Sequence, residues 1–164
     1  MISFTQLECE KIINFSNVLT KTERDESPRL ISYDFYSIGY SSDTKWIFDR
    51  FNNYFTEETG IDVLEPLDTI HLFDYSVGDK FTRHRDVYYE NQTYNIGACL
   101  NDDYEGGEFV LYQPKHTVLS KNIGEIYTFD HTYEYEVMEV TKGHRWSLIG
   151  FYFYKHLDLK RPLL

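Results

Sequence analysis

The sequence predicts a mostly β protein with N-terminal helices, an α+β fold in one domain over residues 1–164. From Thr69 onward, short segments rich in aromatic and β-branched residues alternate with turn signals, whereas earlier apolar residues recur at helical spacing. Six or more such strands indicate a sandwich or barrel, and the helices before them suggest a helical layer on one face. We therefore expect helical support over about residues 1–62 and a β core over about residues 63–158.

Two helices are expected in the first third of the chain. Thr5 and Glu8 have the spacing of a capping box, in which each side chain satisfies a backbone amide at the start of a helix. A second helix should begin near residues 42–43 and end at Gly60. Between them, residues 21–28 are charged and weakly apolar, so we expect little stable order there. The apolar residues expected along the two helices are Leu7, Ile12, Phe15, Val18, Leu19, Trp46, Ile47, Phe51 and Phe55.

The β core should contain at least six strands. The chain has 15 Tyr and 12 Phe residues, which favour pleated, half-buried surfaces. Glycine-containing turn signals separate the segments in which these residues concentrate. The expected strands are Ile70–Tyr75, Asn95–Leu100, Phe109–Tyr112, Ile126–Phe129, Tyr133–Val140 and Trp146–Tyr154.

Composition excludes several classes of partner. The 16 basic and 27 acidic residues give a net charge of -11, which argues against binding nucleic acid or an anionic membrane surface. The longest apolar-aromatic run, Leu148–Tyr154, is far too short to span a bilayer. Two cysteines, Cys9 and Cys99, indicate an intracellular and cytoplasmic protein rather than a disulfide scaffold. Composition leaves the oligomeric state undefined.

The pair His84 and Asp86 is the strongest chemical signal. Residues two apart on a strand point to the same face, so one imidazole nitrogen and one carboxylate oxygen can meet a single metal ion. Two histidines and one carboxylate on one face of an ion form the non-haem Fe(II) oxygenase arrangement. The spacing alone is weak evidence, because a surface ion pair has the same pattern.

Three surrounding patterns strengthen that hypothesis. They are Tyr75-x-x-Gly78-x-x-Phe81-x-x-His84-x-Asp86, Leu100-Asn-Asp-Asp-Tyr-Glu-Gly-Gly-Glu-Phe109 and Val137-x-x-Val140-x-x-Gly143-x-Arg145-x-Ser147-Leu148. In order and spacing they closely resemble the prolyl 4-hydroxylase branch of the 2-oxoglutarate/Fe(II)-dependent dioxygenases, over roughly Thr69 to Tyr154. The resemblance implies a double-stranded β-helix core, a jelly-roll or cupin-like fold, supported by N-terminal helices.

The resemblance also implies site residues. His84 and Asp86 match the first two iron ligands and are the expected catalytic residues. Arg145 matches the residue that holds the distal carboxylate of 2-oxoglutarate, a task that suits a guanidinium fork. Ser147 should point the same way as Arg145. Tyr75 matches a tyrosine that reaches the cosubstrate or its neighbourhood, and cosubstrate binding is also expected at one further position, Asn95.

The implied activity is a 2-oxoglutarate- and Fe(II)-dependent hydroxylation. Oxidative decarboxylation of 2-oxoglutarate to succinate and CO₂ would accompany hydroxylation of a prolyl or other residue in a peptide or protein. A free amino acid or another small molecule stays open as substrate, and ascorbate stays open as an accessory cofactor.

Two departures from the family pattern affect this expectation. The second iron histidine should lie ten residues before Arg145, where the chain has Tyr135. Tyr135 could ligate the metal as a phenolate, His131 could bend in, or the site could bind metal weakly with two protein ligands. The alternative function is a non-catalytic or metal-altered pseudo-oxygenase that serves as a binding or scaffold module.

The second departure is Cys99, which stands where related hydroxylases often have a tyrosine that shares the 2-oxoglutarate carboxylate. Asn95, Gly97 and Cys99 should share one strand face. This composition predicts a roomier and less polar wall.

Overall fold

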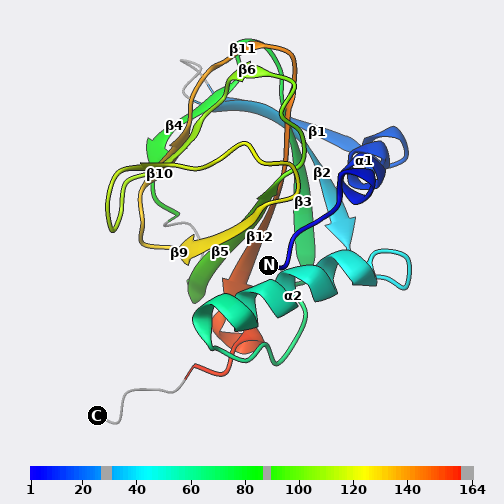
Figure 1. The fold of residues 1–164 in the computed structure, drawn as a ribbon, viewed down its shortest axis with the longest axis vertical. Helices are drawn as coiled ribbons and strands as arrows, with labels where there is room; N and C mark the ends of the chain where they lie inside the picture. The colour runs from blue at the N-terminus through cyan, green and yellow to red at the C-terminus, as the bar shows by residue number, and fades with distance from the viewer. Residues whose placement is uncertain (27–30, 87–89, 160–164) are drawn as a thin grey trace.

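The computed structural model describes residues 1–26, 31–86 and 90–159, and all statements below concern these ranges. Two α-helices and two short 3₁₀ turns accompany the strands (Figure 1). The helical elements are α1 (Gln6–Ile13), η1 (Asn14–Asn17), α2 (Lys45–Thr59) and η2 (Tyr154–His156). The strands are β1 (Lys21–Glu26), β2 (Ile31–Gly39), β3 (Thr69–Tyr75), β4 (Lys80–His84), β5 (Gln92–Cys99), β6 (Glu105–Gly106), β7 (Phe109–Leu111), β8 (Thr117–Val118), β9 (Ile126–Asp130), β10 (Tyr135–Val137), β11 (Val140–Lys142) and β12 (Arg145–Phe153).

The main sheet is antiparallel and curls upon itself. Its strand order is β8, β7, β10, β4, β2, β3, β12, β5 and β9, with β1 paired to β2, and β6 and β11 form a separate ribbon. In Figure 1, β4 and β10 lie across from β3, β12 and β5, and the helices lie outside the curl. Neighbours in this order come from distant parts of the sequence, which brings the end of β4 beside the start of β10.

Side chains that point alternately to the two faces of each strand form two separate hydrophobic cores. On β3, Ile70 and Leu72 pack toward the helices, whereas Phe73 and Tyr75 belong to a cluster within the curl. Successive side chains of a strand point to opposite faces of the sheet, so a single strand contributes residues to both cores. The inner cluster is dominated by aromatic residues, which accounts for the high Tyr and Phe content. Its buried members are Tyr33, Tyr75, Phe81, Phe109, Phe129, Tyr135, Val137 and Val140.

The helices begin and end close to the predicted positions. Thr5 and Glu8 form the capping box of α1. Gly60 ends α2 in the left-handed conformation, with φ 71°, where glycine has no Cβ penalty. Two residues expected on the apolar helical face are largely exposed, Leu7 at 60% and Val18 at 79%. No helix in the described ranges is long and apolar enough to cross a membrane.

The expectation that the first 62 residues form only helical support is wrong. Lys21–Glu26 and Ile31–Gly39 are strands, paired with each other and, through β2, with β3 and β4. The stretch expected to lack order is therefore strand β1 as far as Glu26, and residues 27–28 lie outside the described ranges. The strand expected at Tyr133–Val140 is split between β10 and β11.

The ion pair between Glu8 and Arg50 predicts an acid-dependent loss of stability. Its Nη2–Oε1 and Nη1–Oε2 distances are 2.8 and 3.0 Å, and it joins α1 to α2. The hydrogen bond from Arg50 outweighs partial burial and lowers the pKa of Glu8 from 4.5 to about 2. The folded-state pKa is the lower one, so this stabilisation is present above pH 4.5 and is lost as pH falls toward 2.

Arg50→Gln should therefore flatten the decline of the free energy of unfolding between these pH values. Urea unfolding at several pH values measures this slope. Lys45→Gln, which removes a charge from an exposed pair on the same helix, is the control. Equal slopes in wild type and Arg50→Gln would contradict the assignment.

Candidate metal and cosubstrate site

His84 ends strand β4 with one ring nitrogen free. Its Nδ1 lies 2.7 Å from the carbonyl oxygen of Thr82. A carbonyl only accepts hydrogen bonds, so Nδ1 carries a proton, and in this tautomer the lone pair that can bind a metal is on Nε2. That Nε2 is buried and has no hydrogen-bond partner in the described ranges. The ring stacks on Phe81, with centroids 3.7 Å apart and planes at 7°, which fixes its orientation.

Asp86 faces the same point as His84, as the i, i+2 spacing predicts. Its Oδ1 lies 3.6 Å from His84 Nε2, too far for a hydrogen bond and suited to two groups that share an ion. Asn95 donates to Oδ2 at 2.6 Å, and Gln92 in turn donates to Asn95 at 2.6 Å. Burial raises the pKa of Asp86, but His84 in its protonated form and the donors Asn95 and Tyr135 outweigh it, so the net pKa is lowered.

Tyr135 lies at the third corner of this group. Its Cα pairs with that of His84 across β10 and β4, and its hydroxyl lies 3.2 and 3.3 Å from the two oxygens of Asp86. Burial and the nearby Asp86 raise the pKa of Tyr135 well above its ordinary value. In the metal-free protein Tyr135 is therefore a neutral phenol that donates to Asp86.

His131 takes no part in this group. Its Nδ1 lies 3.0 Å from the carbonyl oxygen of Thr93, at the other end of the β9–β10 connection. Within the described ranges, no three His, Cys, Asp or Glu side chains lie together as a metal site. Of the two candidates for the third ligand, the geometry favours Tyr135.

Arg145 is a buried cation without a carboxylate partner in the described ranges. It is 4% exposed, and it donates from Nη1 to Ser147 at 2.9 Å, as the strand spacing predicts. Its Nε has no partner in those ranges, and its guanidinium lies 5.4 Å from the ring centroid of Tyr75. A charged group buried this way is costly unless an anion binds it. The residue opposite its stem is Gly107, where a Cβ would lie 3.1 Å from Arg145 Cδ.

Tyr127 lines the small cavity beside Arg145, on the wall where the sequence predicts Asn95, Gly97 and Cys99. It pairs with Gly97, and a Cβ there would lie 2.5 Å from the Tyr127 hydroxyl oxygen. The prediction of a roomier, less polar wall is therefore wrong, because the Tyr127 ring fills the space over Gly97. Burial raises the pKa of Tyr127 to about 12, while the adjacent Arg145 acts in the opposite direction. A phenol thus lies beside Arg145 although Cys99 replaces the expected tyrosine.

The clash over Gly97 has a measurable consequence. Gly97→Ala should lower the free energy of unfolding by about 2 kcal/mol, because the new methyl overlaps the Tyr127 ring. Tyr127→Leu removes that ring, so the double variant should be more stable than the sum of the single effects indicates. Gly39→Ala, where a Cβ meets nothing within 4 Å, is the control. Additive effects in urea unfolding would contradict this packing.

The space between Arg145 and the metal-facing group, which consists of His84, Asp86 and Tyr135, is almost filled by side chains. A cavity of about 20 Å³ lies there, which is room for about one water molecule. Its wall includes Tyr75, Tyr127, Tyr135, Arg145 and Ser147. Side chains must therefore move before a dicarboxylate of five carbons can reach Arg145.

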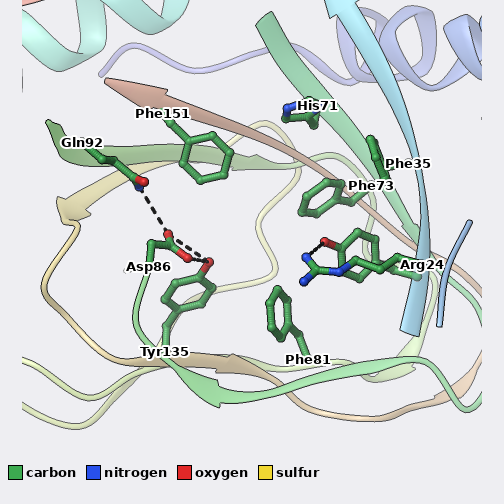
Figure 2. A pocket seen from close by; sticks show the side chains of 10 residues that line it. Arg24, Phe35, His71, Phe73, Phe81, Asp86, Gln92, Tyr135 and Phe151 are labelled. Carbon is green, nitrogen blue, oxygen red and sulfur yellow. Dashed lines mark hydrogen bonds between the residues drawn. The ribbon is translucent and has the colours of Figure 1, made fainter. Parts of the chain in front are cut away.

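A second, larger cavity of about 500 Å³ shares Phe73, Phe81 and Tyr135 with the small cavity, and Asp86 also lines it. Figure 2 shows Asp86 and Tyr135 at one side of it, with the terminal nitrogens of Arg24 pointing toward them from the opposite side. Most of this cavity could not be recognised from sequence motifs, because its walls come from β1, β2, β3 and β12. Its lining residues are Arg24, Tyr33, Phe35, His71, Phe73, Phe81, Asp86, Gln92, Tyr135 and Phe151.

The predicted site residues do converge. His84, Asp86 and Tyr135 form one group, and Arg145, Ser147 and Tyr75 form a second group across the small cavity. Asn95 supports Asp86 by a hydrogen bond.

Comparison with solved structures confirms the double-stranded β-helix fold. A 2OG-Fe(II) oxygenase family oxidoreductase from Burkholderia pseudomallei is 16% identical with a TM-score of 0.71, covering 92% of this chain and 80% of that one. A Pseudomonas putida prolyl-4-hydroxylase is 14% identical with a TM-score of 0.68, covering 90% and 84%. A Trichoplax adhaerens prolyl hydroxylase, solved with a hypoxia inducible factor peptide fragment, is 14% identical with a TM-score of 0.74, covering 90% and 77%.

Sequence comparison identifies the family. A search of curated proteins finds no match. The sequence model of the 2OG-Fe(II) oxygenase superfamily matches residues 70–153, more than half of the chain, and this range includes both groups of the site. Fe(II) and 2-oxoglutarate are the cofactors that this family implies. With the fold and the half-buried His84–Asp86 pair, the match shows that the chain belongs to the 2OG-Fe(II) oxygenase superfamily.

Proposed function

We propose that this protein is a 2-oxoglutarate- and Fe(II)-dependent oxygenase that hydroxylates a prolyl or other residue of a peptide or protein. The observation that carries the proposal is the buried Nε2 of His84, which has no hydrogen-bond partner in the described ranges and faces Asp86 next to Tyr135. A buried nitrogen lone pair beside a carboxylate fits a divalent cation. The guanidinium of Arg145, which has no carboxylate partner in the described ranges, fits the distal carboxylate of 2-oxoglutarate.

The residues present supply positions for both groups. His84 and Asp86 would hold the metal, with Tyr135 as the third side chain. When bound, Fe(II) with 2-oxoglutarate and O₂ supplies oxidative decarboxylation to succinate and CO₂, coupled to oxygen transfer into a C–H bond. The carbonyl of Thr82 keeps the proton on His84 Nδ1, and Asn95 orients Asp86. The ring of Phe81 covers His84 and excludes water from one side.

An anaerobic titration with Fe(II) and 2-oxoglutarate tests this proposal. Chelation of the metal by 2-oxoglutarate should produce a weak visible charge-transfer band that saturates, and Arg145→Gln should raise the 2-oxoglutarate concentration required by at least about tenfold. Succinate formation in air then reports turnover. Absence of the band at saturating concentrations of both would contradict the proposal.

The second candidate is a pseudo-oxygenase that binds a ligand without catalysis. Two observations favour it: the Tyr135 hydroxyl lies 3.2 and 3.3 Å from the two oxygens of Asp86, and the cavity beside Arg145 has only about 20 Å³. This function predicts neither a charge-transfer band nor succinate, and equal ligand binding by wild type and His84→Ala.

A further inference from the structure

The larger cavity has the size and lining of a small-ligand site. Its volume of about 500 Å³ lies within the range of ordinary ligand pockets. The strands β2, β3, β4 and β12 line it with aromatic rings, including those of Phe73, Phe81 and Phe151. Tyr33 packs on Phe73 with ring centroids 4.6 Å apart, so part of this wall is already fixed. Asp86 and Tyr135 also line the cavity, so an occupant would lie next to the metal-facing group.

Arg24 is the only cationic residue among the lining residues described above. Its guanidinium carbon lies 5.7 Å from the ring centroid of Tyr33 and 5.4 Å from that of Phe81, so two aromatic rings neighbour the cation. Nη1 donates to the Tyr33 hydroxyl at 2.8 Å, and Nε and Nη2 each lie 2.8 Å from Glu26 Oε1. These contacts use three of the five N–H donors of an arginine.

One N–H on each terminal nitrogen of Arg24 is thus left without a partner in the described ranges, and Figure 2 shows these nitrogens pointing into the cavity. Two such donors on a planar guanidinium match the two oxygens of a carboxylate. Glu26, whose side chain is 54% exposed, balances the charge of Arg24 on the solvent side and leaves the cavity side open.

We propose that Arg24 binds a carboxylate of the substrate, whose apolar part packs among Phe73, Phe81 and Phe151 and thereby lies beside Asp86 and Tyr135. This inference rests on the proposed oxygenase function and names the chemistry of its substrate: an apolar group joined to a carboxylate. The carboxylate belongs either to a small acid or to an acidic residue of a peptide.

The cosubstrate has a separate anchor. Arg145 lies across the small cavity, is 4% exposed and is directed by Ser147, whereas the Arg24 side chain is 33% exposed and can be reached from solvent. A substrate that enters from solvent meets Arg24 first.

Binding of matched probes tests the proposal on the full chain without requiring turnover. We would measure the Kd of 3-phenylpropionate and of 3-phenylpropionamide by isothermal titration calorimetry. The two probes have nearly the same shape, and only the first carries a charge. The acid should bind at least about tenfold more tightly than the amide to wild type, because a charge-assisted pair is lost in the amide.

Variants locate that preference. Arg24→Gln should remove the difference between acid and amide, Arg24→Lys should retain part of it, and Lys45→Gln, an exposed charge on α2, should leave it intact. A peptide pair, N-acetyl-Phe-Asp-amide and N-acetyl-Phe-Asn-amide, distinguishes the sources. A preference for the Asp peptide exceeding that for the free acid identifies an acidic residue, and the reverse identifies a small acid.

Two outcomes overturn the inference. The first is equal affinity of wild type for the acid and the amide. The second is loss of 2-oxoglutarate binding in Arg24→Gln with binding retained in Arg145→Gln, which would make Arg24 the cosubstrate anchor. Failure of the proposed function is distinguishable, because an acid preference that depends on Arg24 without a charge-transfer band would refute only the oxygenase activity.

Discussion

His84→Ala is expected to abolish iron binding while leaving the protein folded. The variant removes the buried Nε2 atom, for which the described part of the chain offers no hydrogen-bond partner, and it leaves Asp86 with its donors Asn95 and Tyr135. Loss of an outer hydrogen-bond partner of a metal ligand already costs 10–100-fold in affinity, so loss of the ligand should cost at least about 100-fold.

The stability cost should be small by comparison. The variant loses the stack on Phe81 and the hydrogen bond to Thr82, but it also removes an unsatisfied buried polar atom. We expect a decrease of about 1 kcal/mol in the free energy of unfolding.

Anaerobic equilibrium dialysis with Fe(II), together with thermal unfolding, measures both effects. The matched control is His144→Ala. His144 also pairs with a carboxylate, Asp74 at 2.8 Å, but its side chain is 57% exposed, so this variant should retain full iron affinity. Retention of iron by His84→Ala would place the metal elsewhere.

Local signals predicted those parts of the fold that local physics determines. The capping box at Thr5, the left-handed glycine at Gly60 and the aromatic strands after Thr69 each depend on neighbours in sequence. Strand β1 could not be predicted this way, because its charged sequence has no alternation. It is ordered by its partner β2, and this pairing places Arg24 against Tyr33 and Phe81.

The site residues also differ in whether they could be predicted from local sequence. His84, Asp86, Arg145 and Ser147 belong to fixed spacings within single strands or their ends, so their common orientation could be predicted. Tyr127 could not, because its position over Gly97 depends on the register between β5 and β9. The alternation of Phe73 and Tyr75 with Ile70 and Leu72 on β3 contains the signal for an aromatic interior, but not which distant side chains share it.

Tyr135→His is expected to increase Fe(II) affinity at least about tenfold, because it adds the second imidazole of the family arrangement. The position is suitable, since the Cα of Tyr135 pairs with that of His84 and its side chain reaches Asp86. The Tyr135 hydroxyl now lies against both carboxylate oxygens, where a shared ion would bind. A shorter imidazole vacates that point and presents a neutral nitrogen, whereas the phenol must first lose a proton whose pKa burial has raised.

Tyr135→Phe separates the two roles that the native residue can have. If Tyr135 ligates the metal, the ferric wild-type protein should show a phenolate-to-iron charge-transfer colour that Tyr135→Phe removes and Tyr135→His replaces with tighter Fe(II) binding. Tyr40→His, which adds a histidine beside Phe48 of α2, controls for adventitious binding. Unchanged colour in Tyr135→Phe, with loss of colour in His131→Ala, would assign the third position to His131 and require the β9–β10 connection to rearrange around the metal.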